Sequence, residues 1–154
     1  MDPLILASAS PARATLLRGA AVAIEVEPAR VDEDAMKAAL RDEGAPPRDQ
    51  ADKLAELKAL RVSARHPGRL VLGADQILTA GDGAFDKPRD RAEAADQLRS
   101  LRGREHRLLS AAVVARDGAA IWRHVGSAKL VMRPFTDAFL ERYLDAMGDD
   151  VTTT

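Results

Sequence analysis

The sequence predicts a single α/β domain in which a mixed β-sheet is flanked by helices. In the first half of the chain, apolar runs typical of buried strands alternate with helical patterns. A strand pair joined by a tight turn follows in the second half, so strands of both orientations are expected in one sheet. The chain has 154 residues, of which 46% are hydrophobic, which suits one buried core and one domain over residues 1–154.

The N-terminal elements begin with a short apolar run, Leu4-Ile5-Leu6-Ala7, that indicates a buried strand. Ser10 is placed to cap a following helix, and Pro11 occupies its first position, where a missing N–H costs nothing. This helix is expected to stop near Gly19. Residues 22–26 are expected to form a second strand.

Two helices and the clearest buried strand are expected next. The acidic residues 32–34 favour the start of a helix that ends at Gly44. Asp49 is placed to cap a longer helix over residues 50–65. The strand, its weak continuation and the turn that follows are expected at residues 70–74, 77–79 and 81–83.

The second half is expected to hold a helix, a hairpin, a further strand and a last helix. Asp90 and Glu93 have the spacing of a capping box for a helix over residues 92–102. Thr136 is placed to cap a last helix that Gly148 ends. We expect a hairpin with strands at 108–115 and 120–124 and its turn at 117–118. A further strand is expected at 129–132, the last helix at 137–147, and a β-prone end at 151–154.

Composition and charge exclude several classes of protein. The 23 basic and 24 acidic residues nearly cancel, which argues against a nucleic-acid partner, and aromatic residues make up only 3%. The chain has no cysteine, so disulfides and thiolate chemistry are excluded. No apolar run reaches the ~18 residues of a membrane span, and the start lacks the pattern of a signal peptide. A cytoplasmic protein without a membrane partner is expected.

The segment Ser8-Ala9-Ser10-Pro11-Ala12-Arg13 is the first candidate site. A strand, a loop of small residues and a helix N-terminus present unpaired backbone N–H groups and a positive dipole to an anion. Ser10 and Arg13 add a hydroxyl and a guanidinium that suits phosphate. The alternative is an ordinary capped helix with a solvated arginine. The segment lacks the signature of a P-loop.

Asp75 is the second candidate, because it is expected to end a fully apolar strand. Open α/β sheets bind ligands beyond the carboxyl ends of their strands. Gly73 and Ala74 would leave room for a group close to the backbone. A carboxylate at this place can hold Mg²⁺ or accept a proton from water. The alternative is an aspartate that caps a turn.

Lys58 is the third candidate, because it shares a helical stripe with small and apolar residues. A lysine in such a stripe either extends its ammonium to water or pairs with a negative group. Lys87 precedes Pro88, which favours an extended loop from which a lysine could reach a phosphate. Glu33 lies among the acidic residues 32–34, which could hold a hydrated Mg²⁺ beside a basic pocket or could simply favour a helix start.

Together these residues suit metal-assisted attack on a phosphate chain better than acyl or hydride chemistry. Their motifs and their order resemble the Maf family of nucleotide pyrophosphatases. The segments that carry the resemblance are 4–17, 31–33, 54–59, 73–76, 87–88 and 101–106.

The resemblance implies hydrolysis of a nucleoside triphosphate to the monophosphate and pyrophosphate, with Mg²⁺ or Mn²⁺ as cofactor. Asp75 would be the catalytic base or a metal-binding carboxylate, and Glu33 would assist with the metal or with water. The residues that would hold the phosphates are Ser10, Arg13, Lys58 and Lys87. The implied fold has two lobes around a central cleft and is related to inosine triphosphatases.

Gln76 is similar to the branch of the family that acts on 7-methyl-GTP, whereas Thr at this place goes with the dTTP and UTP branch. A dTTP or UTP pyrophosphatase is therefore one alternative, and a non-catalytic nucleotide-binding regulator of septum formation is another. The resemblance also implies a possible homodimer. Family members continue for several tens of residues beyond a segment like this one, so the family's C-terminal segment is expected to be lacking.

Overall fold

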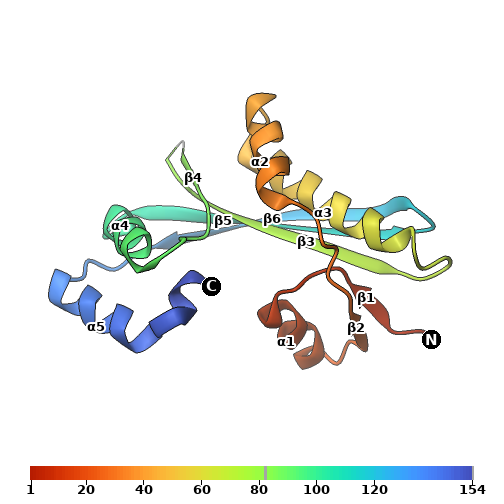
Figure 1. The fold of residues 1–154 in the computed structure, drawn as a ribbon, viewed down its shortest axis with the longest axis horizontal. Helices are drawn as coiled ribbons and strands as arrows, with labels where there is room; N and C mark the ends of the chain where they lie inside the picture. The colour runs from red at the N-terminus through yellow and green to blue at the C-terminus, as the bar shows by residue number, and fades with distance from the viewer. Residues whose placement is uncertain (82, 154) are drawn as a thin grey trace. The chain divides into compact units, whose positions relative to one another are not determined.

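The computed structural model describes residues 1–81 and 83–153. Its six strands form one mixed sheet in the order β2-β1-β3-β5-β6, with β4 paired to β3 (Figure 1). β1 pairs in parallel with β2 and β3, whereas β3 and β4 are antiparallel. The strands are β1 (Leu4–Leu6), β2 (Ile24–Val26), β3 (Val71–Ala80), β4 (Gly83–Phe85), β5 (Glu105–Arg116) and β6 (Ala119–Val131). The predicted mixed sheet is confirmed.

Five α-helices and a final 3₁₀ turn complete the described residues. They are α1 (Pro11–Gly19), α2 (Glu33–Asp42), α3 (Pro47–Ser63), α4 (Arg91–Leu101), α5 (Asp137–Met147) and η1 (Gly148–Thr152). The hydroxyls of Ser10 and Thr136 and the carboxylate of Asp90 accept hydrogen bonds from the first-turn N–H groups of their helices, as predicted. None of the helices described is both long and apolar enough to cross a membrane.

Several element boundaries differ from the expectation. α3 begins at Pro47 rather than residue 50, and Asp49 lies in its first turn instead of capping it, because proline is favoured at the first helical position. Residues 71–80 form one continuous strand. The expected separate strand at 129–132 is wrong, since β6 runs unbroken to Val131.

The C-terminal expectation also changes, because residues 148–152 form the 3₁₀ turn η1 rather than a strand. Thr154 of the β-prone segment 151–154 and Asp82 of the turn expected at 81–83 lie outside the described residues. The turn between β5 and β6 is as predicted: Asp117 and Gly118 both have positive φ, 51° and 75°, the geometry of a type I′ hairpin.

The chain divides into two compact units. The first comprises residues 1–76 and 109–126, and the second comprises residues 77–108 and 127–154. This division corresponds to the two expected lobes, while the central cleft stays a prediction.

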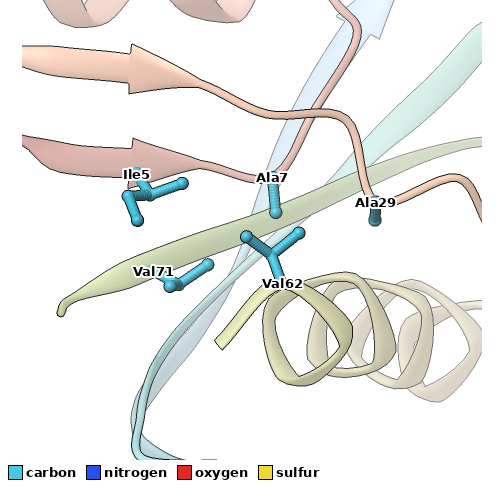
Figure 2. Close-up of a cluster of buried hydrophobic side chains, with 5 residues drawn as sticks. All are labelled: Ile5, Ala7, Ala29, Val62 and Val71. Atoms are coloured by element: carbon cyan, nitrogen blue, oxygen red, sulfur yellow. The ribbon is translucent and has the colours of Figure 1, made fainter. Parts of the chain in front are cut away.

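Each unit has its own apolar cluster. In the first unit, β1, β3, α3 and the segments that follow β1 and β2 contribute side chains that gather in one place (Figure 2), namely Ile5, Ala7, Ala29, Val62 and Val71. In the second unit, Leu140 and Leu144 of α5 pack with Ala94 and Ala95 of α4, and Val151 of η1 joins them. Burial of Val151 against this cluster explains why the C-terminal end turns back on α5 instead of extending as a strand.

Candidate functional site

The centre of the candidate site is a buried ammonium between two carboxylates, all in the first unit. The Nζ atom of Lys58 lies 2.9 Å from Oδ1 of Asp75 and 2.7 Å from Oε1 of Glu33. Lys58 and Asp75 are each only 5% exposed, whereas the Glu33 side chain is 44% exposed. We refer to these three residues as the Lys58 cluster. It unites three residues that the sequence placed on separate elements.

The position of Lys58 follows from the apolar stripe of α3. Ala51, Leu54, Ala55 and Val62 of that stripe are all buried with it. Of the two alternatives for a lysine in a stripe, the structure shows pairing with negative groups rather than extension to water. This pairing offsets the large cost of burying a charge.

Close contact between α3 and β3 brings Lys58 to Asp75. A Cβ atom at Gly73 would lie 2.0 Å from the carbonyl oxygen of Ala55 and 2.7 Å from the backbone nitrogen of Ala59. Only glycine fits there. Gly73 leaves room for a group close to the backbone, as expected, and that group is the backbone of α3.

Asp75 also lies elsewhere than expected. It does not end a strand, since β3 continues from Val71 to Ala80. Its side chain points to the buried side, toward α3 and Lys58. Its second oxygen, Oδ2, is buried and has no hydrogen-bond partner in the described part of the chain. This atom is an acceptor ready for a group that the protein itself does not supply.

The start of α1 contacts the same strand. Nη1 of Arg13 donates hydrogen bonds of 3.0 Å to the carbonyl oxygen of Ala74 and to Oγ of Ser8. Ser8 also accepts a hydrogen bond from the backbone N–H of Ser10, at 3.2 Å. Arg13 is therefore held against the residue that precedes Asp75. Contacts through Nη1 leave its Nε and Nη2 hydrogens pointing to no acceptor among the described residues.

Ser8 lies in the candidate segment 8–13, but sequence reasoning gave it no role of its own. It is 5% exposed and joins the loop to Arg13. Its signal was its place at the end of the buried run 4–7, where a polar side chain that stays buried needs a partner.

Glu33 is held as a carboxylate by its surroundings. Burial raises its pKa, but the hydrogen bond and charge of Lys58, with smaller effects from Lys37 and Arg13, outweigh burial and bring the pKa below its ordinary value of 4.5. Its position at the start of α2 follows from Asp32, whose Oδ1 accepts the N–H of Ala35 at 3.0 Å. Because the charge of Arg13 on α1 contributes to the lowered pKa of Glu33 on α2, the first turns of these two helices share one electrostatic environment.

The two remaining predicted site residues, Gln76 and Lys87, have other hydrogen-bond partners. Gln76 is exposed, and its Nε2 donates to Oγ of Ser110 at 2.9 Å, on the face of β3 opposite to Asp75 because side chains alternate along a strand. Lys87 belongs to the second unit, where its Nζ donates to the carbonyl oxygen of Thr153 at 3.3 Å.

Residues 101–106, the last segment of the resemblance, make structural contacts within the second unit. Arg102 places its guanidinium 5.2 Å from the ring centroid of Phe135 and pairs with Asp137 at 3.0 Å. His106 is buried, with Nδ1 lacking a hydrogen-bond partner in the described part of the chain. No role in substrate binding follows from these contacts alone.

The donor set of the Lys58 cluster fits a hard divalent cation. Among the described residues, no three His, Asp or Glu side chains come together, so Glu33 and Asp75 are the two protein ligands on offer. Mg²⁺ is commonly bound through one or two carboxylates plus substrate phosphates. Oδ2 of Asp75, buried without a partner, is the oxygen left for it. The binding of a metal at this place and the identity of that metal both stay predictions.

Known proteins and a known family resemble this chain over almost its whole length. The sequence model of the family described as "Maf-like protein" matches residues 3–152. A protein of Ruegeria sp. (strain TM1040) named nucleoside triphosphate pyrophosphatase is 52% identical over 148 residues, covering 96% of this chain and 74% of that protein. A protein of Rhizobium etli named 7-methyl-GTP pyrophosphatase is 50% identical over 146 residues, covering 95% of this chain and 73% of that protein.

A solved structure shares the fold. The HAM1 protein from Coxiella burnetii matches with a TM-score of 0.50 at 17% sequence identity, covering 84% of this chain and 72% of that one. This likeness supports the predicted fold class and nothing beyond it. The match of the family over nearly the whole chain, together with relatives at about half identity, leads to one conclusion: the chain belongs to the Maf-like protein family.

Proposed function

We propose that this chain is an acid-anhydride hydrolase that converts a nucleoside triphosphate to the monophosphate and pyrophosphate, with 7-methyl-GTP as its substrate. The observation that carries the proposal is the buried Lys58 cluster, in which Asp75 keeps one oxygen without a partner. Relatives at about half identity that are named nucleoside triphosphate pyrophosphatases support the reaction class.

The positive groups of the first unit suit the phosphate chain. Arg13 keeps Nε and Nη2 for phosphate oxygens while Nη1 anchors it to β3. The N-terminus of α1, with Ser10 as its cap, adds a positive dipole and a hydroxyl. Lys58 offers an ammonium beside the same strand. Lys87 is proposed as a further phosphate contact from the second unit.

Asp75 suits the role of general base. Its Oδ2 can accept a hydrogen bond from a water molecule and take a proton from it as the water oxygen attacks the α-phosphorus. The bond between that phosphorus and the bridging oxygen breaks, and pyrophosphate leaves. Lys58, hydrogen-bonded to Oδ1, holds the carboxylate in place. Mg²⁺ or Mn²⁺, held by Glu33, Asp75 and phosphate oxygens, would neutralise negative charge on the phosphates.

The choice of 7-methyl-GTP rests on two observations. Position 76 carries Gln, as in the branch described above, and a relative at 50% identity is named 7-methyl-GTP pyrophosphatase. Gln76 lies on the face of β3 opposite to Asp75, so it supports the branch by its identity at this position and not by a contact with the Lys58 cluster. Hydrolysis of dTTP or UTP is the second candidate. We place the reaction in the cytoplasm, with a homodimer as the expected assembly.

A non-catalytic regulator of septum formation is a candidate of another class. A protein that only binds triphosphate does not need a carboxylate with a vacant oxygen beside its cations, since that carboxylate would repel the phosphates. The partnerless Oδ2 of Asp75 therefore favours the enzyme.

Pyrophosphate release tests the proposal. Purified protein is incubated with Mg²⁺ or Mn²⁺ and 7-methyl-GTP, GTP, dTTP, UTP or CTP, beside the Asp75→Asn variant. Asn keeps an oxygen for Lys58 but cannot take a proton, so we expect turnover to fall about 10²- to 10⁴-fold with the fold retained. Circular dichroism checks the fold.

Asp90→Asn is the matched control, because Asn caps a helix as well as Asp does and Asp90 lies at the start of α4 in the second unit. Its turnover should stay unchanged. Retained turnover in Asp75→Asn would remove Asp75 from catalysis. Release from dTTP or UTP but not from 7-methyl-GTP would keep the reaction and overturn the substrate.

A further inference from the structure

The ammonium of Lys58 lies against both of the carboxylates that would bind a metal ion. Its Nζ is within 2.9 Å of an oxygen of Asp75 and within 2.7 Å of an oxygen of Glu33. A Mg²⁺ ion bound by Asp75 and Glu33 would need their carboxylate oxygens at about 2.0–2.1 Å. Even an ion that took Oδ2 of Asp75 would lie close to the ammonium of Lys58, and the two positive charges would repel each other.

The net charge of the Lys58 cluster also disfavours the binding of a free divalent ion. Two carboxylates and one ammonium leave a net charge of −1, compared with −2 for the carboxylates alone. Lys58 and Asp75 are both nearly inaccessible to water, so their attraction and any repulsion by Lys58 are only weakly screened. A free divalent ion must compete with a counter-ion that is covalently part of the protein.

An incoming triphosphate changes this balance. Its oxygens offer Lys58 new acceptors and bring additional ligands to the metal. Of the three hydrogens on Nζ, the described contacts use two, so a phosphate oxygen can be engaged before either carboxylate is released. Oδ2 of Asp75, which is buried and has no hydrogen-bond partner among the described residues, is the oxygen of that carboxylate that Lys58 does not engage.

We propose that Lys58 acts as an internal counter-ion that keeps free divalent cations off Glu33 and Asp75, so that the metal binds together with the triphosphate and not before it. This inference rests on the proposed function for the identity of the anion. It makes Lys58 a positioning residue for metal entry as well as a phosphate contact.

Mn²⁺ binding without nucleotide is the test, with the EPR signal of the aquo ion reporting free Mn²⁺. We expect weak binding by the wild-type protein. Lys58→Met keeps an unbranched side chain and removes the charge, so we expect Mn²⁺ to bind at least about tenfold more tightly. Equal affinities in the two proteins would overturn the proposal.

Two further variants make the comparison specific. Lys53→Met removes a positive charge from the same helix, but Lys53 pairs with Glu56 at 3.2 Å and lies outside the Lys58 cluster. Its Mn²⁺ affinity should match the wild type, and a gain equal to that of Lys58→Met would show a general charge effect and overturn the proposal. Adding Glu33→Gln to Lys58→Met should abolish the gain.

If circular dichroism shows that Lys58→Met does not fold, the proposal is tested on the wild-type protein by measuring Mn²⁺ binding with and without phosphate. Inorganic phosphate gives the ammonium an alternative partner, so it should tighten Mn²⁺ binding by the wild type at least about threefold, or 0.65 kcal/mol. No change on addition of phosphate would overturn the proposal.

Pyrophosphate release measured in parallel separates the two proposals. Tighter Mn²⁺ binding in Lys58→Met without release from any triphosphate by the wild type supports the counter-ion and contradicts the proposed reaction. Release by the wild type without any gain in Lys58→Met supports the reaction and overturns the counter-ion.

Discussion

At the scale of single residues, Arg13 has two tasks that use different atoms. Nη1 is bound to the Ala74 carbonyl and to Ser8, which positions the guanidinium. Nε and Nη2 are then aimed by the planar geometry of the group. A guanidinium fixed in this way would lose less rotamer freedom on binding a phosphate, so we expect Ser8 to contribute to affinity without touching the substrate.

Ser8→Ala tests this division of tasks. The variant loses the acceptor that faces Arg13 and the Ser10 N–H, so Arg13 keeps a single anchor on β3. We expect KM for the triphosphate to rise roughly threefold to tenfold, with a smaller change in kcat and a loss of about 1 kcal/mol of stability. Steady-state kinetics and urea unfolding measure the two effects.

Thr136→Ala is the matched control for Ser8→Ala. It removes the cap of α5 in the second unit, where Thr136 Oγ1 accepts the N–H of Phe139 at 3.1 Å, and should cost about 1 kcal/mol without changing KM. An unchanged KM in Ser8→Ala would show that Ser8 has only a structural role.

At the scale of elements, the site depends on how closely α3 approaches β3. Gly73 and Asp75 lie two residues apart on β3, and Ala55 and Ala59 flank Lys58 on α3. The same close approach that excludes a side chain at Gly73 thus sets the 2.9 Å contact between Lys58 and Asp75. The packing of α3 on β3 and the proposed catalytic site therefore depend on one helix–strand contact.

Gly73→Ala should break this contact. The new methyl group would meet backbone atoms, which cannot move aside as a side chain would, so α3 must shift away from β3. We expect a loss of about 1–3 kcal/mol or more in unfolding free energy and a marked fall in turnover. Urea unfolding and pyrophosphate release measure the two losses.

Gly126→Ala on β6 is the control, because the atom closest to a new Cβ there would be Nε2 of His124 at 3.7 Å, an ordinary contact distance. It should leave stability nearly unchanged. A Gly73→Ala variant as stable as Gly126→Ala would contradict the described packing of α3 on β3.

Local signals in the sequence were sufficient for most elements. Thr136 and Gly148 bounded α5 correctly, because caps and breakers act within one turn. The continuity of β3 through Asp75 was not predictable in the same way, since a charged residue in an apolar strand looks like its end until its partner is known. That partner, Lys58, lies 17 positions earlier on another element.

The same limit applies to the candidate site. The stripe on α3 correctly marked Lys58 as facing inward, and periodicity was enough for that. The contact of Glu33 and Asp75 with its ammonium could not be predicted from periodicity, because that contact depends on the tertiary fold. Gly73 shows the converse: its small size was a correct signal of close approach, but the approaching group is a helix and not a ligand.

At the scale of the whole molecule, acid stability should depend on carboxylates held by cations. Hydrogen bonds from Arg65 and His66 bring the pKa of Glu27 below its ordinary value of 4.5, and Lys58 does the same for Glu33 against the opposing effect of burial. A carboxyl group with a lowered pKa in the folded state stabilises the protein fully above its unfolded pKa. That stabilisation is lost as pH falls through the folded pKa.

Glu27→Gln isolates one such contribution. Glu27 follows β2 and contacts Arg65 at 2.6 Å and His66 at 2.6 Å, both just beyond α3, so it ties two segments of the first unit together. We expect the variant to be less stable than the wild type by at most about 1 kcal/mol at pH 7, because the contacts are partly exposed. The difference should shrink as pH falls below 4.5 and through the lowered pKa of Glu27, because the wild-type carboxyl then becomes protonated. Urea midpoints between pH 3 and pH 7 measure it, with Asp2→Asn as a control that removes one negative charge from an exposed position. A difference that persists unchanged at pH 3 would mean that Glu27 stabilises the fold by packing and not by its charge.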